Sequence, residues 1–184
     1  PLLAVAITPI LGSYVDNKGK AASMLMIGSL LLIVCHLTFA FILPMFKGNA
    51  IGGIIVAYLT ILVLGASFSL VPAALWPSVP KLVDEKIIGS AYALIFWIQN
   101  IGLWLFPILI GKVLDSTNVE LVRQIEKATA TKDTTTIEML AKQFDYTWPM
   151  LIFALLGVAS FVIGIILKGV DKKKHLGLEE PIVK

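Results

Sequence analysis

The sequence is poor in the residues on which most soluble proteins and enzymes depend. Only 15% of its 184 residues are charged, whereas about a quarter are charged in an average soluble domain. Its single cysteine, Cys35, excludes an internal disulfide framework. The chain contains no nucleophile–base pair, metal-binding cluster, phosphate-binding loop or basic patch with interleaved aromatics. We therefore predict that the protein is not an enzyme, uses no cofactor and binds no nucleic acid.

What the sequence has instead is long uncharged runs, because 58% of its residues are hydrophobic. A helix needs about 20 apolar residues to cross the hydrocarbon of a lipid bilayer. Four runs are long enough, at 21–46, 50–80, 87–111 and 146–167. A fifth run, 1–15, is too short, and it begins at Pro1 without a signal peptide. We expect an all-α, polytopic membrane helix bundle with a partial first span, and a fragment whose N-terminal part is missing.

Lysines in the connections predict how these spans are oriented, because positive charge is retained on the cytoplasmic side. The connections 16–20 and 81–86 each carry two lysines, and the tail 168–184 carries a lysine cluster. These segments are expected in the cytoplasm, with 47–49 and the long loop 112–145 outside. The five basic residues of the long loop count little because six acidic residues balance them.

The expected outer loop carries two signals for helix starts. Thr117-x-x-Glu120 and Thr135-x-x-Glu138 each fit the capping-box pattern, in which a threonine and a glutamate bond each other's backbone N–H groups. We expect two short amphipathic helices joined by the Thr-rich stretch 129–136. This loop either covers the outer surface or binds a partner, and we favour the cover.

Two helix ends repeat one pattern. The run that starts the chain ends in PILGSYVD, residues 9–16, and a later run ends in PILIGKVLD, residues 107–115. The lysine pattern places the first copy inside and the second outside. Copies on opposite faces are typical of the inverted-topology repeats of secondary transporters, although a chance match of two short strings is the alternative.

The first copy continues into a motif that resembles the loop motif of the major facilitator superfamily, Gly-x-x-x-Asp-Arg/Lys-x-Gly-Arg/Lys. Its residues here are Gly12, Asp16, Lys18, Gly19 and Lys20, with Asn17 where the family has a basic residue. In that family the motif lies between helices 2 and 3 and recurs between helices 8 and 9. Since four spans follow it, the resemblance assigns this chain to helices 8 to 12, the C-terminal half. The missing N-terminal half would be its partner.

A narrower resemblance covers ALWPSVPKLVDEKIIGSAYALIFWIQNIGL, residues 74–103. This stretch is similar to a lysosomal member of the superfamily and its bacterial relatives. The resemblance implies a secondary active or facilitative transporter of small organic solutes by alternating access, with short peptides as the leading substrate and a coupling proton left open. We expect a bacterial inner membrane, with the lysosomal membrane as the alternative. A non-transporting accessory or receptor-like protein is the alternative function.

Two amides at the middle of the fourth span are the candidate substrate contacts, because buried amides in lipid need partners. Gln99 shares a helical face with Tyr92 and Phe96, which suits a small organic solute. Asn100 lies about 100° away on a face with two tryptophans, and it is expected to pack against a neighbouring helix. Trp76 is expected to close the inner side of the pathway, with an aromatic anchor at the inner membrane interface as the alternative.

The remaining candidates concern gating. Asp16 opposes the dipole of its own helix, so it is expected to latch onto a cation or another helix, with a solvated turn acid as the alternative. Gly12 is expected to let a neighbouring helix approach closely. His36 is expected to be neutral and bonded to a neighbouring helix. Five residues are expected to let two spans flex: Pro72, Pro77, Gly102, Pro107 and Gly111.

Overall fold

The computed structural model describes residues 2–46 and 48–181, and every regular element in them is helical. In chain order these are α1 (Leu2–Lys18), α2 (Ala21–Leu37), the π-helical turn η1 (Thr38–Ile42), the 3-10 turns η2 (Leu43–Phe46) and η3 (Glu85–Ile87) on either side of α3 (Ala50–Leu82), then α4 (Ile88–Thr117), α5 (Val119–Ala130), α6 (Thr134–Ala141) and α7 (Thr147–Lys174). Within the described part, four stretches are long and apolar enough to cross a membrane: Ala21–Phe46, Ala50–Leu82, Glu85–Thr117 and Thr147–Lys174. The prediction of an all-α polytopic membrane bundle is confirmed.

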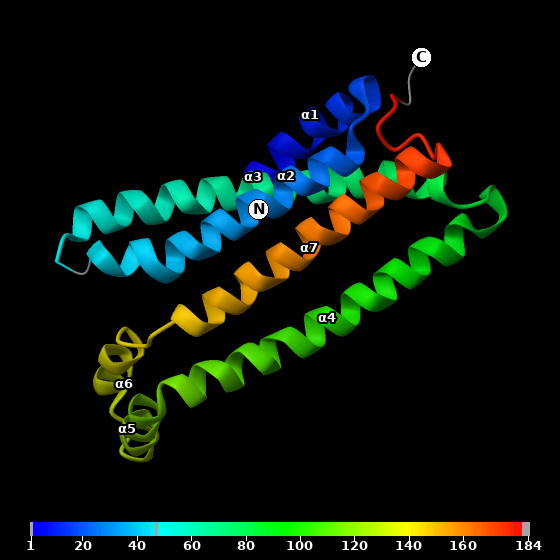
Figure 1. Cartoon of the computed structure of the whole chain (residues 1–184). Helices are drawn as coiled ribbons and strands as arrows, with labels where there is room; N and C mark the ends of the chain where they lie inside the picture. The colour runs from blue at the N-terminus through cyan, green and yellow to red at the C-terminus, as the bar shows by residue number, and fades with distance from the viewer. Residues whose placement is uncertain (1, 47, 182–184) are drawn as a thin grey trace.

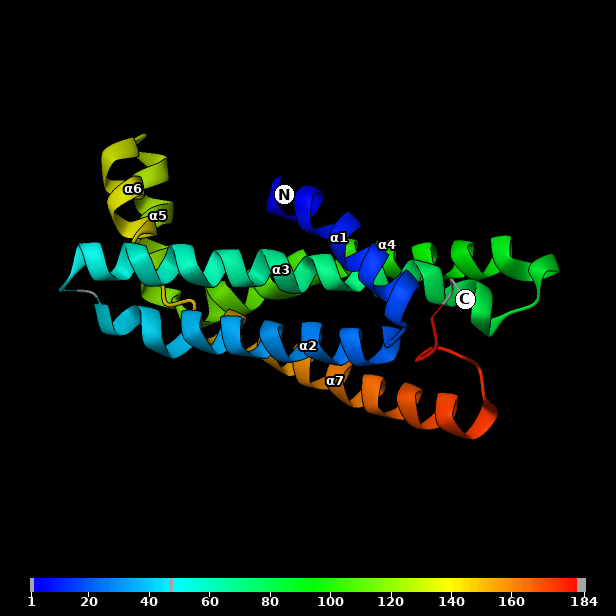
Figure 2. The same cartoon turned by 90° about the horizontal axis from the view of Figure 1, so that it is seen from above.

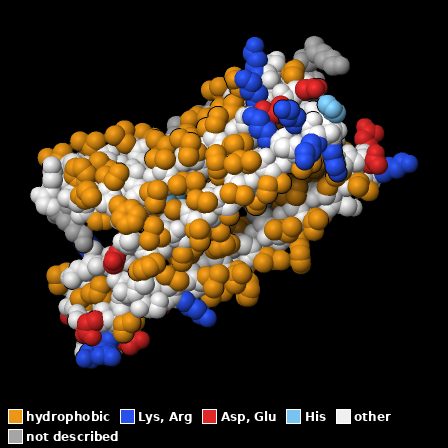
Figure 3. All heavy atoms as spheres, in the orientation of Figure 1, with side chains coloured by type: hydrophobic (Ala, Val, Ile, Leu, Met, Phe, Trp, Pro, Cys, Tyr) orange, Lys and Arg blue, Asp and Glu red, His pale blue; other side chains and the backbone are white. Residues whose placement is uncertain are grey.

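The helices continue beyond the boundaries that charge alone suggests. α4 reaches Thr117 rather than ending at 111, and α7 reaches Lys174 rather than ending at 167. The expected spans were delimited by the first charged residues, but lysine is a good helix former and does not end a helix. The charged surface of the molecule agrees with this, because Lys, Arg, Asp and Glu gather at its two ends while hydrophobic side chains cover the middle of the visible face (Figure 3).

The connections also gather at two ends. The α1–α2 turn, the α3–α4 connection and the end of α7 lie at one end of the bundle, which we call the tail end (Figures 1 and 2). The α2–α3 connection, α5 and α6 lie at the other, which we call the cap end. The last turns of α1 and α4, which carry the two copies of the repeated pattern, are therefore at opposite ends, as an inverted repeat requires.

Helix α2 packs against both α3 and α7, and small residues bring the three backbones close (Figure 2). Gly157 of α7 lies against Ile33 of α2, and Gly28 of α2 lies against Leu70 of α3. Ser67 Oγ donates to the carbonyl of Gly28 at 2.7 Å. Small residues and short hydroxyl bonds are how membrane helices associate when lipid is as apolar as their side chains.

The two predicted capping boxes are wrong. Helix α5 begins after Asn118, and Thr117 belongs to the end of α4, where its hydroxyl donates to the carbonyl of Val113 at 2.9 Å. Helix α6 begins after Asp133, whose carboxylate accepts from Thr136 N at 3.0 Å and from Thr136 Oγ1 at 2.6 Å. These bonds lower the pKa of Asp133 below its ordinary value. Asp is a better residue at the first cap position than threonine, so α6 begins at the stronger cap. The side chain of Asn118 makes no cap bond to α5 and instead bonds the backbone of Leu114 and Asp145.

The glycine packing can be tested at Gly157, where an added Cβ would come within 2.8 Å of Ile33 Cγ1. Gly157→Ala should force Ile33 to shift and lower the free energy of unfolding by about 1–3 kcal/mol. Gly169→Ala on the same helix is the control, since no described atom lies within 4 Å of its Cβ. Thermal unfolding of the full-length protein in detergent measures both, and equal melting temperatures would contradict the packing.

Candidate functional site

Three of the five predicted pathway residues form an aromatic cluster between α3 and α4. The ring of Trp76 stacks on Phe96 with centroids 5.1 Å apart and meets Tyr92 at 5.7 Å. Tyr92 Oη donates to the backbone carbonyl of Trp76 at 3.0 Å. That carbonyl is available because the residue four positions later, Pro80, has no N–H to bond it. The proline therefore creates the acceptor that fixes α4 against α3 at this point.

Gln99 extends this cluster along α4. It lies three residues after Phe96 and seven after Tyr92, which is one helical face, and it is exposed in the middle third of the span. Within the described chain the side chain of Gln99 forms no hydrogen bond. An amide on the same helical face as Tyr92 and Phe96 can both donate to and accept from a polar solute, so the arrangement fits the predicted contact.

Asn100 behaves differently. Its Nδ2 donates to the carbonyl of Phe96, on its own helix, at 2.8 Å, and the residue is exposed. Among the described residues it therefore holds no second helix, and its predicted packing role stays a prediction about surfaces outside them. Helix α4 as a whole contacts α3 and α7, but none of its residues is buried.

The turn after α1 carries the predicted gate motif. Asp16 is half-buried, and no described residue bonds its carboxylate, so its predicted latch contact is not formed here. No described atom lies within 4 Å of a Cβ built on Gly12, so the close helix approach expected there is not made among the described residues and stays a prediction. The glycine that the geometry requires is Gly19, which has a φ of 72°. A Cβ on Gly19 would also collide with the backbone of Glu179 and Glu180.

The residues expected to let helices flex all lie inside continuous helices. Pro72 and Pro77 lie within α3, and Gly102, Pro107 and Gly111 lie within α4. Both helices run through these positions without a break. Flexing at them stays a prediction.

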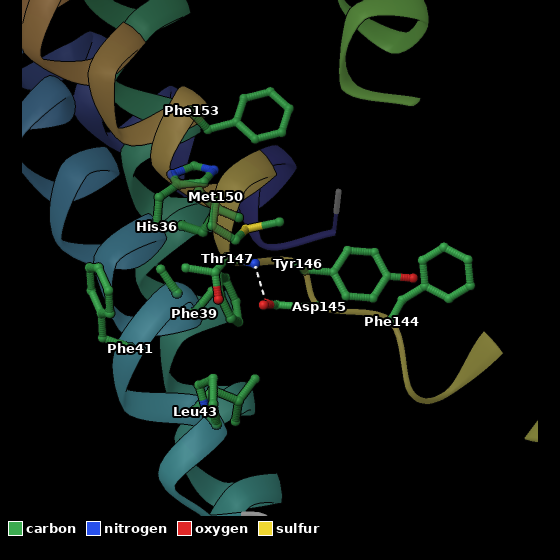
Figure 4. Close-up of a pocket in the computed structure, with 13 residues that line it drawn as sticks. His36, Phe39, Phe41, Leu43, Phe144, Asp145, Tyr146, Thr147, Met150 and Phe153 are labelled. Atoms are coloured by element: carbon green, nitrogen blue, oxygen red, sulfur yellow. Dashed lines mark hydrogen bonds between the residues drawn. The ribbon is translucent and has the colours of Figure 1, made fainter. Parts of the chain in front are cut away.

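His36 bonds its own helix rather than a neighbour, which corrects the expectation. Its Nδ1 lies 2.8 Å from the carbonyl of Leu32, one turn earlier, and its ring tilts against Phe153 of α7 at 5.3 Å (Figure 4). The histidine touches the neighbouring helix only through ring packing. Because Nδ1 is bonded within its own helix, that nitrogen needs no polar partner on α7.

Sequence reasoning missed a cavity of about 800 Å³ at the cap end, which His36 helps to line. Its walls come from the end of α2, η1, η2, α3, the α6–α7 connection and the start of α7. They are mostly aromatic and aliphatic, including Phe39, Phe41, Tyr146 and Met150 (Figure 4). The signal was a concentration of aromatics at 39–46 and 144–153. The cavity is of ligand size and includes polar side chains such as His36 and Thr147, but it lies at the cap end, away from the Trp76 cluster.

Comparison with known proteins adds a distant relative. No protein-family model matches the chain, and no solved structure matches it. The chain is 31% identical over 115 residues to the lysosomal dipeptide transporter MFSD1 of Homo sapiens, 32% identical to that of Mus musculus over the same length, and 31% identical over 114 residues to that of Danio rerio.

The chain is distantly homologous to part of MFSD1. The matched residues are 62% of this chain but only 22% of the length of each of these three relatives, so the chain spans about a fifth of them. The relatives are transporters and not enzymes. The resemblance drawn from residues 74–103 is confirmed at this level, as distant and partial homology to a membrane transporter.

The two ends of the bundle predict a labelling pattern. Cysteines placed singly at Lys18, Lys86 and Lys172 should react from one side of the membrane, and those at Asn49 and Thr131 from the other, because the connections separate in this way and the lysines mark the cytoplasm. The measurement is labelling of the cysteine-free, full-length protein with an impermeant thiol reagent in sealed vesicles. Reaction of positions 18 and 131 from the same side would overturn the topology.

Proposed function

We propose that this chain is the C-terminal half, helices 8 to 12, of a major facilitator superfamily transporter that moves small organic solutes by alternating access. The observation that carries the proposal is homology to a dipeptide transporter, joined to an aromatic cluster and an exposed amide in the middle of a membrane span. We place the protein in a bacterial inner membrane with its C-terminus in the cytoplasm, and the lysosomal membrane is the alternative.

Short peptides are the substrate class that we propose. A peptide bond has one donor and one acceptor, and the Gln99 amide matches both. The faces of Phe96 and Tyr92 beside it would pack against an apolar side chain, and Trp76 would close the pathway toward the tail end. The charged termini of a peptide need groups of opposite sign, which we expect from the missing N-terminal half.

Uptake by the full-length protein in proteoliposomes tests the function. Labelled dipeptides, sugars and amphipathic drugs are offered separately, with and without an inward proton gradient. Accumulation of dipeptides above empty liposomes supports the proposal, and stimulation by the gradient would add a coupling proton. Uptake of none of the three classes would favour the accessory or receptor-like alternative.

Gln99→Leu should raise the KM for a transported dipeptide about three- to tenfold, because one neutral hydrogen bond is worth about 0.5–1.5 kcal/mol. Asn100→Leu is the matched control, since it changes the next residue in the same way but removes a bond within the helix. The control should leave KM unchanged. Normal transport by Gln99→Leu, with stability lost instead, would place the substrate site outside this chain.

Asp16→Asn should lower the maximal uptake rate about three- to tenfold with little change in KM. A latch at the tail end sets the balance between inward- and outward-facing states, and the substitution removes its charge. Asp84→Asn is the control, because Asp84 is an exposed acid at the same end whose side chain caps no helix. Equal rates for the two variants would identify Asp16 as a solvated turn acid.

A further inference from the structure

The segment that follows α7 folds back over the tail end of the bundle. We call residues 175–180 the tail strap. The chain leaves α7 through His175 and turns again at Gly177, both at positive φ. It then places Leu178 in a fully buried position against the other helices. A surface tail of this length is ordinarily mobile unless something ties it down, and three sets of contacts tie this one.

The first set completes the start of α2. The first N–H groups of a helix have no partner within the helix, and Lys20, which precedes α2, gives no side-chain cap. The strap supplies acceptors for two of these N–H groups, those of Ala21 and Ser23. The carbonyl of Leu178 accepts from Ala21 N at 3.0 Å, and the carboxylate of Glu179 accepts from Ser23 N at 2.9 Å and from Ser23 Oγ at 2.7 Å. A carboxylate also suits the positive end of the helix dipole.

The second set holds the strap to α7. The buried carboxylate of Asp171 accepts from Leu178 N at 2.9 Å and from Glu179 N at 3.3 Å. Lys168, one turn earlier, reaches the Glu179 carboxylate at 3.5 Å and Ser23 Oγ at 2.6 Å. A buried carboxylate is stable only when its oxygens are bonded, so Asp171 stabilises one tail conformation.

The third set holds the strap to α3 and to the α1–α2 turn. This turn carries the predicted gate motif, and we call it the gate turn. Lys81 Nζ, at the end of α3, donates to the carbonyls of Gly177 at 2.7 Å and Glu180 at 2.8 Å. Gly19 of the gate motif lies so close to the strap that a side chain there would collide with the backbone of Glu179 and Glu180. The strap therefore touches the α1–α2 turn, α2, α3 and α7 together.

We propose that the tail strap is a built-in fastener that joins the gate turn to the ends of α3 and α7, with Glu179 as its positioning residue. Glu179 reaches no predicted substrate contact and acts through α2. Because α2, α3 and α7 are bonded to one short peptide that also packs against Gly19, their tail ends move as a rigid unit. The consequence for transport rests on the proposed function: a loosened gate turn would slow the exchange between inward- and outward-facing states without altering the substrate site.

Hydrogen–deuterium exchange of the full-length protein in nanodiscs tests the fastener without any transport measurement. Glu179→Ala should speed exchange in peptides covering residues 19–24 about tenfold, since a charge-assisted bond to the first turn is lost. Glu180→Ala is the control, because Glu180 contributes its backbone carbonyl and not its carboxylate. The control should leave exchange unchanged, and Glu179→Gln, which keeps an acceptor at the same length, should restore part of the protection.

Transport gives the second readout. Glu179→Ala should reduce the maximal uptake rate and leave KM unchanged, and Glu179→Gln should recover part of the rate. If Glu179→Ala cannot be purified folded, Glu179→Gln is compared directly with Glu180→Gln by exchange. Unchanged exchange at 19–24 in the Glu179 variants overturns the fastener, whether or not the protein transports. If exchange at 19–24 is faster in the Glu179 variants but the full-length protein takes up none of the solutes, the fastener is supported and the proposed function is rejected.

Discussion

The constraint behind much of this structure is that backbone N–H and C=O groups in lipid must be bonded within the protein, because hydrocarbon offers no partner. Helices meet it along their length, but prolines in α3 remove donors and leave carbonyls open. Tyr92 bonds one of them, the carbonyl of Trp76. Serines, threonines and Asn100 bond carbonyls of their own helices elsewhere. Among the described residues, no buried side-chain nitrogen or oxygen lacks a partner.

The same constraint acts at helix ends, where it links the gate turn to the tail. A helix whose first turn lies against other protein segments cannot rely on water for its N–H groups. Helix α2 begins after Gly19 and Lys20, both at positive φ, and neither carries a capping side chain. Bonding these groups from the end of the chain stabilises the helix start. It also makes the conformation of the gate turn depend on a segment more than 150 positions away.

Much of the fold followed from the sequence because its causes are local. Uncharged runs fix which segments enter lipid, and helical periodicity placed Tyr92, Phe96 and Gln99 on one face. The errors arose where two local candidates competed or where a contact was long-range. Asp133 replaced Thr135 as the cap of α6, and α5 begins after Asn118, whose side chain bonds Asp145 rather than the helix start. His36 found its bond one turn away. Gly12 and Gly19 look equivalent in a motif, and only the folded position of Glu179 and Glu180 shows that Gly19 is the one a side chain would disrupt.

Helix α4, which carries most of the candidate site, is more exposed than the other spanning helices. A spanning helix with no buried residue among those described has nearly all of its surface left for lipid or for the rest of the protein. An uncompensated amide facing lipid is costly, so Gln99, which no described residue bonds, is better explained by a polar surrounding than by hydrocarbon. The face that carries it also carries the rings fixed by Trp76, whose position depends on a proline. The geometry of the candidate site therefore rests on the bond that joins α3 to α4, from Tyr92 to the carbonyl that Pro80 leaves open.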